Sequence, residues 1–427
     1  MNLNGESFRK RLLPIACSQA VGVACGVVGV KVVSKLVEPA VLGVYGIFLS
    51  FATVGIWFVH AGVIRYVSRN WASADDKNRI WAAARRAWAK KTGWLFLCAV
   101  LIGLLVCRGR PGSLAAFVLP LAVAASLLSL GTLAQTALQA ERNHWRDLVI
   151  SSVGSLTRTF VPPVLYFFSG GIVALYTGYS IHALCLAGVG LWILRARGVG
   201  HASASGAALE AIYDGPLFSV LALANWMLTG ATRWIVAWRF GSETAGQFTL
   251  AGNIALIIPA VLGAIFLQYC QPGFFSIVDS GEPGARLRLG RYVDRVVLLL
   301  GTASLAGLAA LRFVSPWLVG WLIDEKYVRA LDWIIPAGCF GLAVIMAQFY
   351  HVMMVAIRRE RACAPVDLGT AAFLLLGGVA AAWQGPVFFQ RALLASPLVI
   401  LLLTRLLARR YLVDAPVNPG PDPRANR

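Results

Sequence analysis

Charged residues are scarce in this chain. Only 13% of its 427 residues are Asp, Glu, Lys or Arg, against about 25% in an average globular protein. Hydrophobic residues make up 58% of the sequence, and the mean hydropathy is +0.72. A soluble domain of this size cannot cover its surface with so few polar groups, which excludes the common soluble enzyme and binding classes. The composition predicts an integral membrane protein.

Acidic residues are the scarcer of the two charged types. The chain has 19 Asp and Glu against 38 Lys and Arg, a formal net charge of +19. No acid lies in the central part of a long apolar run; Asp147, Asp294 and Asp367 all come near the ends of such runs. A transporter that exchanges a cationic drug for a proton is expected to need a buried carboxylate. This absence favours an anionic substrate over a cationic drug.

Patterns typical of metal sites and disulfide frameworks are also lacking. The eight cysteines form no C-x-x-C pair, and most lie in apolar runs, where they act as small apolar residues. The sequence contains no D-x-D-type metal site and no Gly-rich phosphate loop. We therefore predict no cofactor, no metal and no catalytic residue. A membrane glycosyltransferase or polymer ligase is left as the alternative from another functional class.

Apolar runs of about 17–25 residues recur along the whole chain, the length a membrane-spanning helix needs. Because lipid offers no partners for backbone polar groups, we predict an all-α integral membrane protein with about 12 transmembrane helices. The predicted spans are 12–30, 41–66, 93–107, 114–138, 147–168, 172–194, 216–238, 246–274, 293–311, 333–356, 366–383 and 387–404. The short run at 93–107 is expected to borrow residues from segment 69–92, which we interpret as an amphipathic helix in the membrane interface.

Basic residues predict the orientation. With both termini in the cytoplasm, the inner segments hold 26 of the 38 Lys and Arg, and the outer loops hold nine. This asymmetry follows the positive-inside rule and matches attraction to anionic lipid. Because the cations are spread over many short loops, we predict no nucleic-acid partner.

The two halves of the chain resemble each other. EPAVLGVYGIFLS follows the first span and SETAGQFTLAGNI follows the seventh, which aligns Gly43 with Gly246 and Tyr45 with Phe248. A second pair, LQAERNHWRD and VAIRRERACA, follows the fourth and tenth spans. Six spans separate each pair, so the predicted repeats are parallel and surround a central cavity. The predicted units are an N-terminal six-helix lobe at 1–200, a C-terminal six-helix lobe at 201–410 and a cytoplasmic tail at 411–427.

Polar side chains recur at helical spacing within three spans. Asn225, Thr229 and Arg233 are spaced i, i+4, i+8 in the seventh span, and Arg158 lies near the middle of the fifth. A charge at the bilayer centre costs at least about 2.5–3.5 kcal/mol, so a shared wet cavity explains these residues better than lipid does. The candidate substrate-binding residues are Arg158, Arg233, Asn225, Thr229, His60, Trp57 and Arg65.

These residues also have structural interpretations. Arg65 and Arg233 can extend to the membrane interface, and Arg158 can cap backbone carbonyls near Pro162 and Pro163, which are expected to break or kink the fifth span. A buried histidine such as His60 is more often a hydrogen-bonded core group than a proton relay. Tryptophans in membrane proteins, Trp57 included, commonly form the interfacial belt.

The order of these features resembles that of the polysaccharide flippase branch of the multidrug, oligosaccharidyl-lipid and polysaccharide exporter superfamily. The matching features are the Gly-x-aromatic turn, HAGVIRYVSR at the end of the second span, the LQAERN loop and an arginine before RFGSETAGQF. The resemblance covers essentially the whole chain. It implies two lobes around a V-shaped cavity that opens to one side at a time. His60 is a departure, because many relatives carry an acid there.

The resemblance further implies a transporter that flips an undecaprenyl-pyrophosphate-linked oligosaccharide, of the exopolysaccharide or O-antigen type, across a bacterial inner membrane. A pyrophosphate suits a guanidinium fork, which fits uncompensated arginines. The expected partners are this lipid-linked substrate, membrane lipid, a polysaccharide polymerase and glycosyltransferases, and the expected state is a monomer. A multidrug or metabolite exporter of the same fold is the alternative.

Overall fold

A computed structural model of the chain describes residues 5–71, 76–107, 111–141, 143–199, 215–280, 282, 284–318, 320–357 and 359–413. Its regular elements are long α-helices and two short 3-10 helices. They are α1 (Gly5–Leu36), α2 (Pro39–Asn70), α3 (Lys77–Cys107), α4 (Pro111–Ala140), α5 (His144–Ser169), α6 (Ile172–Arg195), α8 (Gly215–Thr229), α9 (Ala231–Ala255), α10 (Ile257–Asp279), α11 (Ala285–Leu318), η2 (Glu325–Ala330), α12 (Leu331–Ala356), η3 (Glu360–Ala362), α13 (Cys363–Gln384) and α14 (Pro386–Val413).

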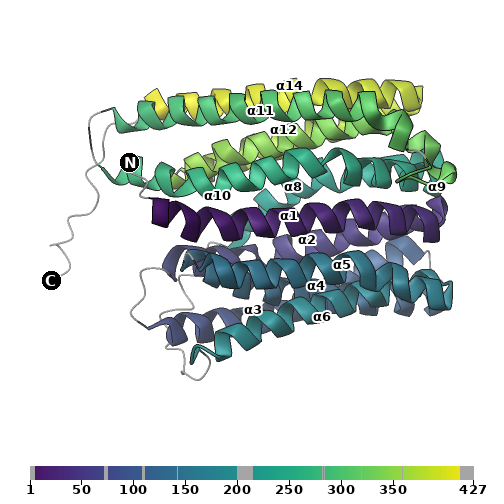
Figure 1. Ribbon diagram of the computed structural model, residues 1–427, viewed down its shortest axis with the longest axis horizontal. Coiled ribbons are helices and arrows are strands. Elements are labelled where there is room, and N and C mark those ends of the chain that lie inside the picture. Colours follow the sequence, from purple (N-terminus) through teal and green to yellow (C-terminus); the bar gives the residue numbers. More distant parts are fainter. Residues whose placement is uncertain are drawn as a thin grey trace.

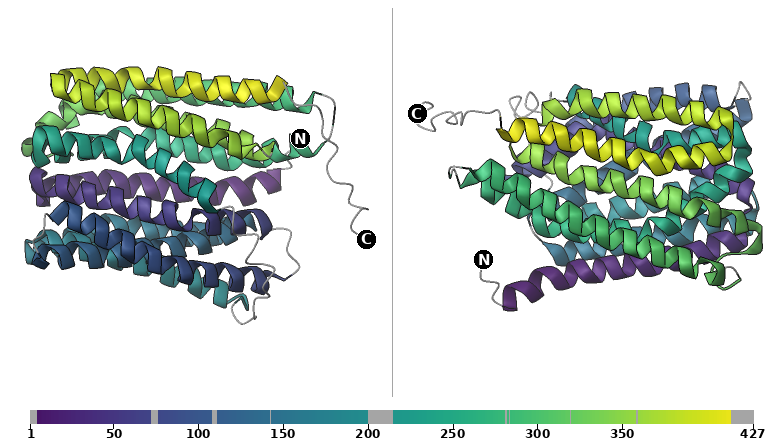
Figure 2. Two further views of the ribbon diagram at one scale, coloured as in Figure 1. Left: turned by 180° about the vertical axis from the view of Figure 1, so that it is seen from behind. Right: turned by 90° about the horizontal axis from the view of Figure 1, so that it is seen from above.

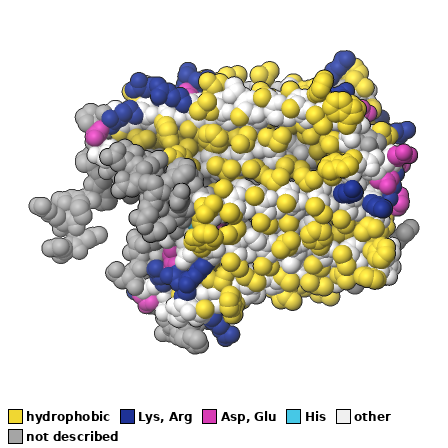
Figure 3. Space-filling model, in the orientation of Figure 1, with side chains coloured by type: hydrophobic (Ala, Val, Ile, Leu, Met, Phe, Trp, Pro, Cys, Tyr) yellow, Lys and Arg dark blue, Asp and Glu magenta, His cyan; other side chains and the backbone are white. Residues whose placement is uncertain are grey.

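The fold is that of an all-α membrane protein, as predicted. Within the described residues, eleven helical stretches are long and apolar enough to cross a membrane, and one of them joins α8 to α9. Hydrophobic side chains cover the middle of the molecule, while Lys and Arg gather toward its two ends (Figure 3). This distribution matches a slab of lipid between two aqueous phases.

The helices run roughly parallel along the length of the molecule, and the start of α1 and the end of α14, the two termini of the described chain, lie at the same end (Figure 1). Helices α1 to α6 occupy one half and α8 to α14 the other, an arrangement that a view from behind repeats (Figure 2). We call the end that carries both termini the terminal end, and the opposite end, with the α1–α2 turn, the distal end. The predicted lobe boundary at residue 200 lies outside the described residues.

Helix α3 corrects one expectation. The basic segment that was predicted to lie in the interface continues without a break into the third span. Trp81 is only 2% exposed, and its ring meets that of Trp71 edge-to-face at 6.3 Å. Trp88 donates a hydrogen bond to the Ser129 hydroxyl of α4 at 2.8 Å. Because these tryptophans pack against protein and not against headgroups, the segment is the first part of one continuous helix that also contains 93–107. Helix α3 is not among the eleven stretches of the described residues that are apolar enough to cross a membrane, so the third span stays a prediction.

The seventh and eighth spans are less regular than predicted. Gly230 separates α8 from α9, so the seventh span is made of two helices. Helix α9 then bends at Gly241, where φ is +89° and ψ is 165°, a conformation that suits glycine. Residues after Gly241 belong to the eighth span, which is interrupted again at Leu256 before α10. These interruptions turn one chain segment into pieces at different angles.

The double proline was predicted to break or kink the fifth span, and of these the break is wrong. Helix α5 runs through Pro162 and Pro163 to Ser169 without ending. Gly178 of α6 accommodates the ring, since a Cβ at residue 178 would lie 2.5 Å from Pro162 Cα. Close packing against α6 therefore holds α5 helical despite the missing N–H donors.

Candidate substrate site

Arg233 lies one turn after the break between α8 and α9. Its N–H donates to the Gly230 carbonyl at 3.2 Å, and the Trp226 indole occupies the space of a side chain at residue 230, where a Cβ would be 2.4 Å from Nε1. The Thr229 hydroxyl donates to the Asn225 carbonyl at 2.8 Å within α8. The predicted i, i+4, i+8 set is thus divided by the break, with Arg233 alone on α9.

Arg158 is an exposed side chain on α5. Beside it, the Thr157 hydroxyl donates to the Val153 carbonyl at 2.7 Å and lies in hydrogen-bond contact with His182 Nδ1 of α6 at 2.9 Å. Pro162 has no N–H to offer the carbonyl four residues earlier, so the Arg158 carbonyl lacks its usual helical donor. The same residue therefore presents a cationic group and an available backbone acceptor.

The charges of the two arginines act on each other across the two halves of the molecule. The charges of Arg158 and Arg233 both act on Tyr179 of α6. The Arg158 charge also acts on Arg233, on Tyr45 of α2 and on His182. Tyr45, Tyr179 and His182 are buried, and the two tyrosine rings lie edge-to-face at 6.4 Å. We call these five residues the arginine site.

The arginine site contains no compensating acid in the part of the chain that the structure describes. The charged groups acting on Tyr45, Tyr179, His182 and Arg233 include no carboxylate. Two guanidinium groups with no described acid beside them, Arg158 exposed and Arg233 partly buried, favour an anion as their counter-charge. Groups of three or more His, Cys, Asp or Glu side chains that could hold a metal are likewise absent from the described residues. The arrangement is suited to holding an anion such as a phosphate.

Aromatic side chains border the arginine site. The ring of Phe51 on α2 stacks with Trp226 at 6.1 Å and meets Trp234 edge-to-face at 4.8 Å. Trp234 directly follows Arg233, so this surface adjoins the cationic groups. The indole N–H groups of Trp226 and Trp234 are both buried without a hydrogen-bond partner. This surface offers apolar faces together with polar edges.

The other predicted site residues lie elsewhere on α2. His60 is 1% exposed, and its ring stacks on that of Trp88 at 6.2 Å. The backbone of Trp88 lies nearby, yet neither ring nitrogen of His60 makes a hydrogen bond of normal geometry. The charged side chain that acts on His60 is Lys91 of α3, and not an arginine of the site. Trp57 and Arg65 are exposed. The structure therefore brings Arg158 and Arg233 together and leaves His60 apart.

Sequence reasoning missed Tyr179 as a neighbour of both arginines. A signal was present in YTGYSIH, where Tyr176, Tyr179 and His182 follow one another at a spacing of three. Residues at i and i+3 share a helix face, so the three form one polar stripe on α6. The sequence indicated Tyr45 only as the aromatic residue of the Gly-x-aromatic repeat. Its closeness to Arg158 depends on how α2 packs against α5 and α6.

Comparison with known proteins supports the architecture. No known protein family and no curated protein matches the chain. Solved structures do match. A structure described as "Inward-facing conformation of a multidrug resistance MATE family transporter of the MOP superfamily" has a TM-score of 0.67 at 10% identity, over 93% of this chain and 98% of that one.

Two further solved structures also match the chain over most of its length. The outward-facing conformation of a multidrug resistance MATE family transporter gives a TM-score of 0.62 at 15% identity, covering 94% of each chain. MATE in the straight conformation gives 0.62 at 13% identity, also covering 94% of each. The chain has the MATE fold. At such low identities the similarity establishes the fold alone.

Proposed function

We propose that this MATE-fold chain flips an undecaprenyl-pyrophosphate-linked oligosaccharide across a bacterial inner membrane by alternating access. One observation carries the proposal. Arg158 from one half and Arg233 from the other act on the same tyrosine, Tyr179, with no described carboxylate acting beside them. An anion that enters between the halves supplies the missing counter-charge.

The chemistry of the substrate fits this site in two ways. Arg158 and Arg233 offer bidentate donors to a pyrophosphate, the geometry that guanidinium groups favour. Phe51, Trp226 and Trp234 form an aromatic surface next to these arginines, and flat apolar faces with polar edges suit sugar rings. Asn225 and Thr229 at the end of α8, with Trp57 and Arg65 on α2, remain candidates for contacts along the oligosaccharide.

The direction of transport is inferred from charge. Both termini of the described chain lie at one end (Figure 1), and the positive-inside rule assigns that end to the cytoplasm. This orientation supports export of a substrate that is made in the cytoplasm. A monomer working with glycosyltransferases and a polymerase is the expected arrangement.

A drug or metabolite exporter is the second candidate. It is favoured by the similar solved structures, two of which are described as multidrug resistance transporters. Against it, the arginine site is cationic and would repel a cationic drug. An anionic metabolite would suit the same residues, so the distinction needs an experiment.

Replacing Arg158 or Arg233 with Ala tests the proposal. Each loss removes charge-assisted hydrogen bonds worth roughly 1.5–3 kcal/mol, so we expect polymer export to fall about tenfold or more. Export is measured as surface polysaccharide in a strain that lacks the chromosomal gene, with the amount of protein in the membrane measured in parallel.

Arg239→Ala is the matched control, because Arg239 lies on the same helix but stacks over Trp383 at 5.0 Å, toward the distal end. Export should stay near normal in this variant. Full export by both arginine variants would remove the charged-site argument. Loss of drug resistance without any change in polysaccharide would favour the exporter instead.

A further inference from the structure

Helices α2 and α9 cross at the distal end with backbones in contact. A Cβ on Gly43 would lie 1.9 Å from the Ser242 carbonyl oxygen, and a Cβ on Gly246 would lie 1.8 Å from that of Pro39. The same offset of 203 residues relates Gly43 to Gly246 and Pro39 to Ser242. The two repeats therefore meet at equivalent positions, and glycine is what permits this approach.

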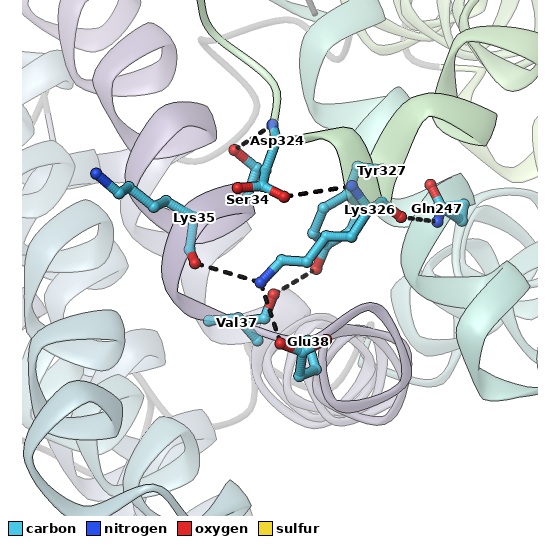
Figure 4. Close-up of polar contacts among 8 residues, drawn as sticks. All are labelled: Ser34, Lys35, Val37, Glu38, Gln247, Asp324, Lys326 and Tyr327. Atoms are coloured by element: carbon cyan, nitrogen blue, oxygen red, sulfur yellow. Dashed lines mark hydrogen bonds and ion pairs between the residues drawn. The ribbon is translucent and has the colours of Figure 1, made fainter. Parts of the chain in front are cut away.

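A segment from the C-terminal half fastens this crossing. We call residues 320–330, between α11 and α12, the strap. Its Tyr327 hydroxyl donates to the Val37 carbonyl at 3.0 Å, and Lys326 Nζ donates to the Lys35 carbonyl and to Glu38 Oε1, both at 3.2 Å (Figure 4). All three acceptors belong to the α1–α2 turn, in the N-terminal half. The strap therefore bonds one half of the molecule to the other.

The acceptors at the end of α1 need these donors. The last carbonyls of a helix have no partner within it, and the residue four after Lys35 is Pro39, which has no N–H. The Lys326 ammonium group donates to the Lys35 carbonyl in place of the missing N–H. Its positive charge is also stabilised by the negative end of the α1 dipole. Tyr327 is 0% exposed, so its bond to Val37 is shielded from water. The strap thus caps a helix of the opposite half.

The strap is held in shape by its own contacts. The Asp324 side chain accepts from Lys326 N at 3.2 Å, and the Tyr327 N–H donates to the Asp324 carbonyl at 2.9 Å. Gln247 of α9 donates to the Lys326 carbonyl at 2.7 Å (Figure 4). Ser34 of α1, in the opposite half, also donates to the Leu322 carbonyl at 3.3 Å. The strap is therefore ordered by contacts with both halves, with its own through Gln247 and with the other through α1.

We propose that the strap is a lock on the distal end, and that opening this end requires the bonds from Lys326 and Tyr327 to break. The acceptors of Lys326 and Tyr327 are backbone or exposed carboxylate oxygens, which can accept hydrogen bonds from water once the halves separate. Water replaces the protein donors when the distal end opens, and the protein donors replace water when it closes. The lock is therefore reversible. The proposal rests on the two-half fold and not on the identity of the substrate.

The test measures how often the distal end opens. Thr249 lies two residues after Gln247, which bonds to the strap; it is 2% exposed and faces Gly46 across the crossing. In a chain whose eight native cysteines are replaced, Thr249→Cys is treated with a thiol reagent that cannot cross membranes, supplied on the side of the distal end. Lys326→Ala and Tyr327→Phe should each raise the labelling rate, by roughly fivefold for each hydrogen bond lost.

Arg329→Ala is the matched control, since Arg329 is exposed on the same strap and makes no bond to α1 or α2 in the part of the chain that the structure describes. Its labelling rate should equal that of the intact strap. Equal rates in Lys326→Ala, Tyr327→Phe and Arg329→Ala would overturn the proposal.

A second measurement covers failure of the cysteine-free chain to fold. Hydrogen–deuterium exchange of the native chain and of Tyr327→Phe is compared over residues 33–38 and 320–330. The proposal predicts faster exchange in both segments together, because they open as one. Faster exchange in the strap alone would show that the strap moves without releasing α1, and would contradict the lock.

Discussion

At the scale of single residues, two buried histidines in similar apolar surroundings have different roles. His182 contacts Thr157 at 2.9 Å and lies within the field of Arg158. His60 stacks on Trp88, and neither of its nitrogens makes a hydrogen bond of normal geometry to the residues that the structure describes. A polar group that is buried without a partner costs about 1–3 kcal/mol. The difference predicts opposite responses to the same substitution.

His60→Leu should leave thermal stability unchanged or raise it, because the substitution removes an unsatisfied polar group and keeps a similar volume. His182→Leu should lower export, since it removes a neighbour of Arg158 and the contact to Thr157. Unfolding of the purified protein in detergent, followed by intrinsic fluorescence, measures the first effect, and surface polysaccharide measures the second. A large loss of stability in His60→Leu would show that a hydrogen bond or water serves this ring.

At the scale of helices, small residues decide which elements can approach. Gly43 and Gly246 permit the crossing of α2 and α9, and Gly178 makes room for Pro162 between α5 and α6. A pattern of helical periodicity predicts that α5 exists, yet it gives no information on whether Pro162 ends it. That outcome depends on the space that α6 leaves for the proline ring.

Gly43→Ala should destabilise the closed distal end by about 1–3 kcal/mol, because a methyl group there overlaps the Ser242 carbonyl. Thermal unfolding and the labelling of Thr249→Cys both report this change. Gly188→Ala on α6 is the comparison, since a Cβ at that position meets nothing within 4 Å. Alanine should there be neutral or slightly stabilising. Equal behaviour of the two variants would argue against a close crossing.

At the scale of the whole molecule, the arginine site and the lock lie between the two halves at different depths. Arg158 and Arg233 meet within the spans, while the strap bonds the halves at the distal end. In a transporter that opens to one side at a time, a substrate held by both arginines adds attraction between the halves. The lock contributes attraction between the halves even when no substrate is bound. Opening the distal end must overcome the lock.

The orientation of the molecule is testable with reporter fusions. A fluorescent protein that folds only in the cytoplasm should light up when it is fused after Arg427. An alkaline phosphatase inserted at Gly170, in the α5–α6 turn at the distal end, should be active, since that enzyme folds only outside the cytoplasm. We expect this pattern because Lys and Arg are in excess at the terminal end, and the positive-inside rule places that end in the cytoplasm. The opposite pattern of the two reporters would reverse the assigned direction of transport.

Several features could be predicted from the sequence because they depend on local chemistry. Apolar runs of the right length identified the spans, since lipid imposes that length on any helix that crosses it. The lack of central acids and the position of Arg158 and Arg233 indicated a cationic site. The Gly43 and Gly246 repeat placed equivalent helices in the same order. Each of these depends on a residue and its neighbours in the chain.

Other features were decided by contacts between residues far apart in the chain. Tyr179 joins both arginines only because α6 packs beside α5 and near α9. His60 is separated from the arginine site because its ring packs against Trp88 of α3. The strap bonds Val37 across 290 residues, and no local pattern marks such a partner. Composition and periodicity determined that this protein spans a membrane and carries an uncompensated positive charge; the packing of helices determined where that charge meets and what holds the distal end shut.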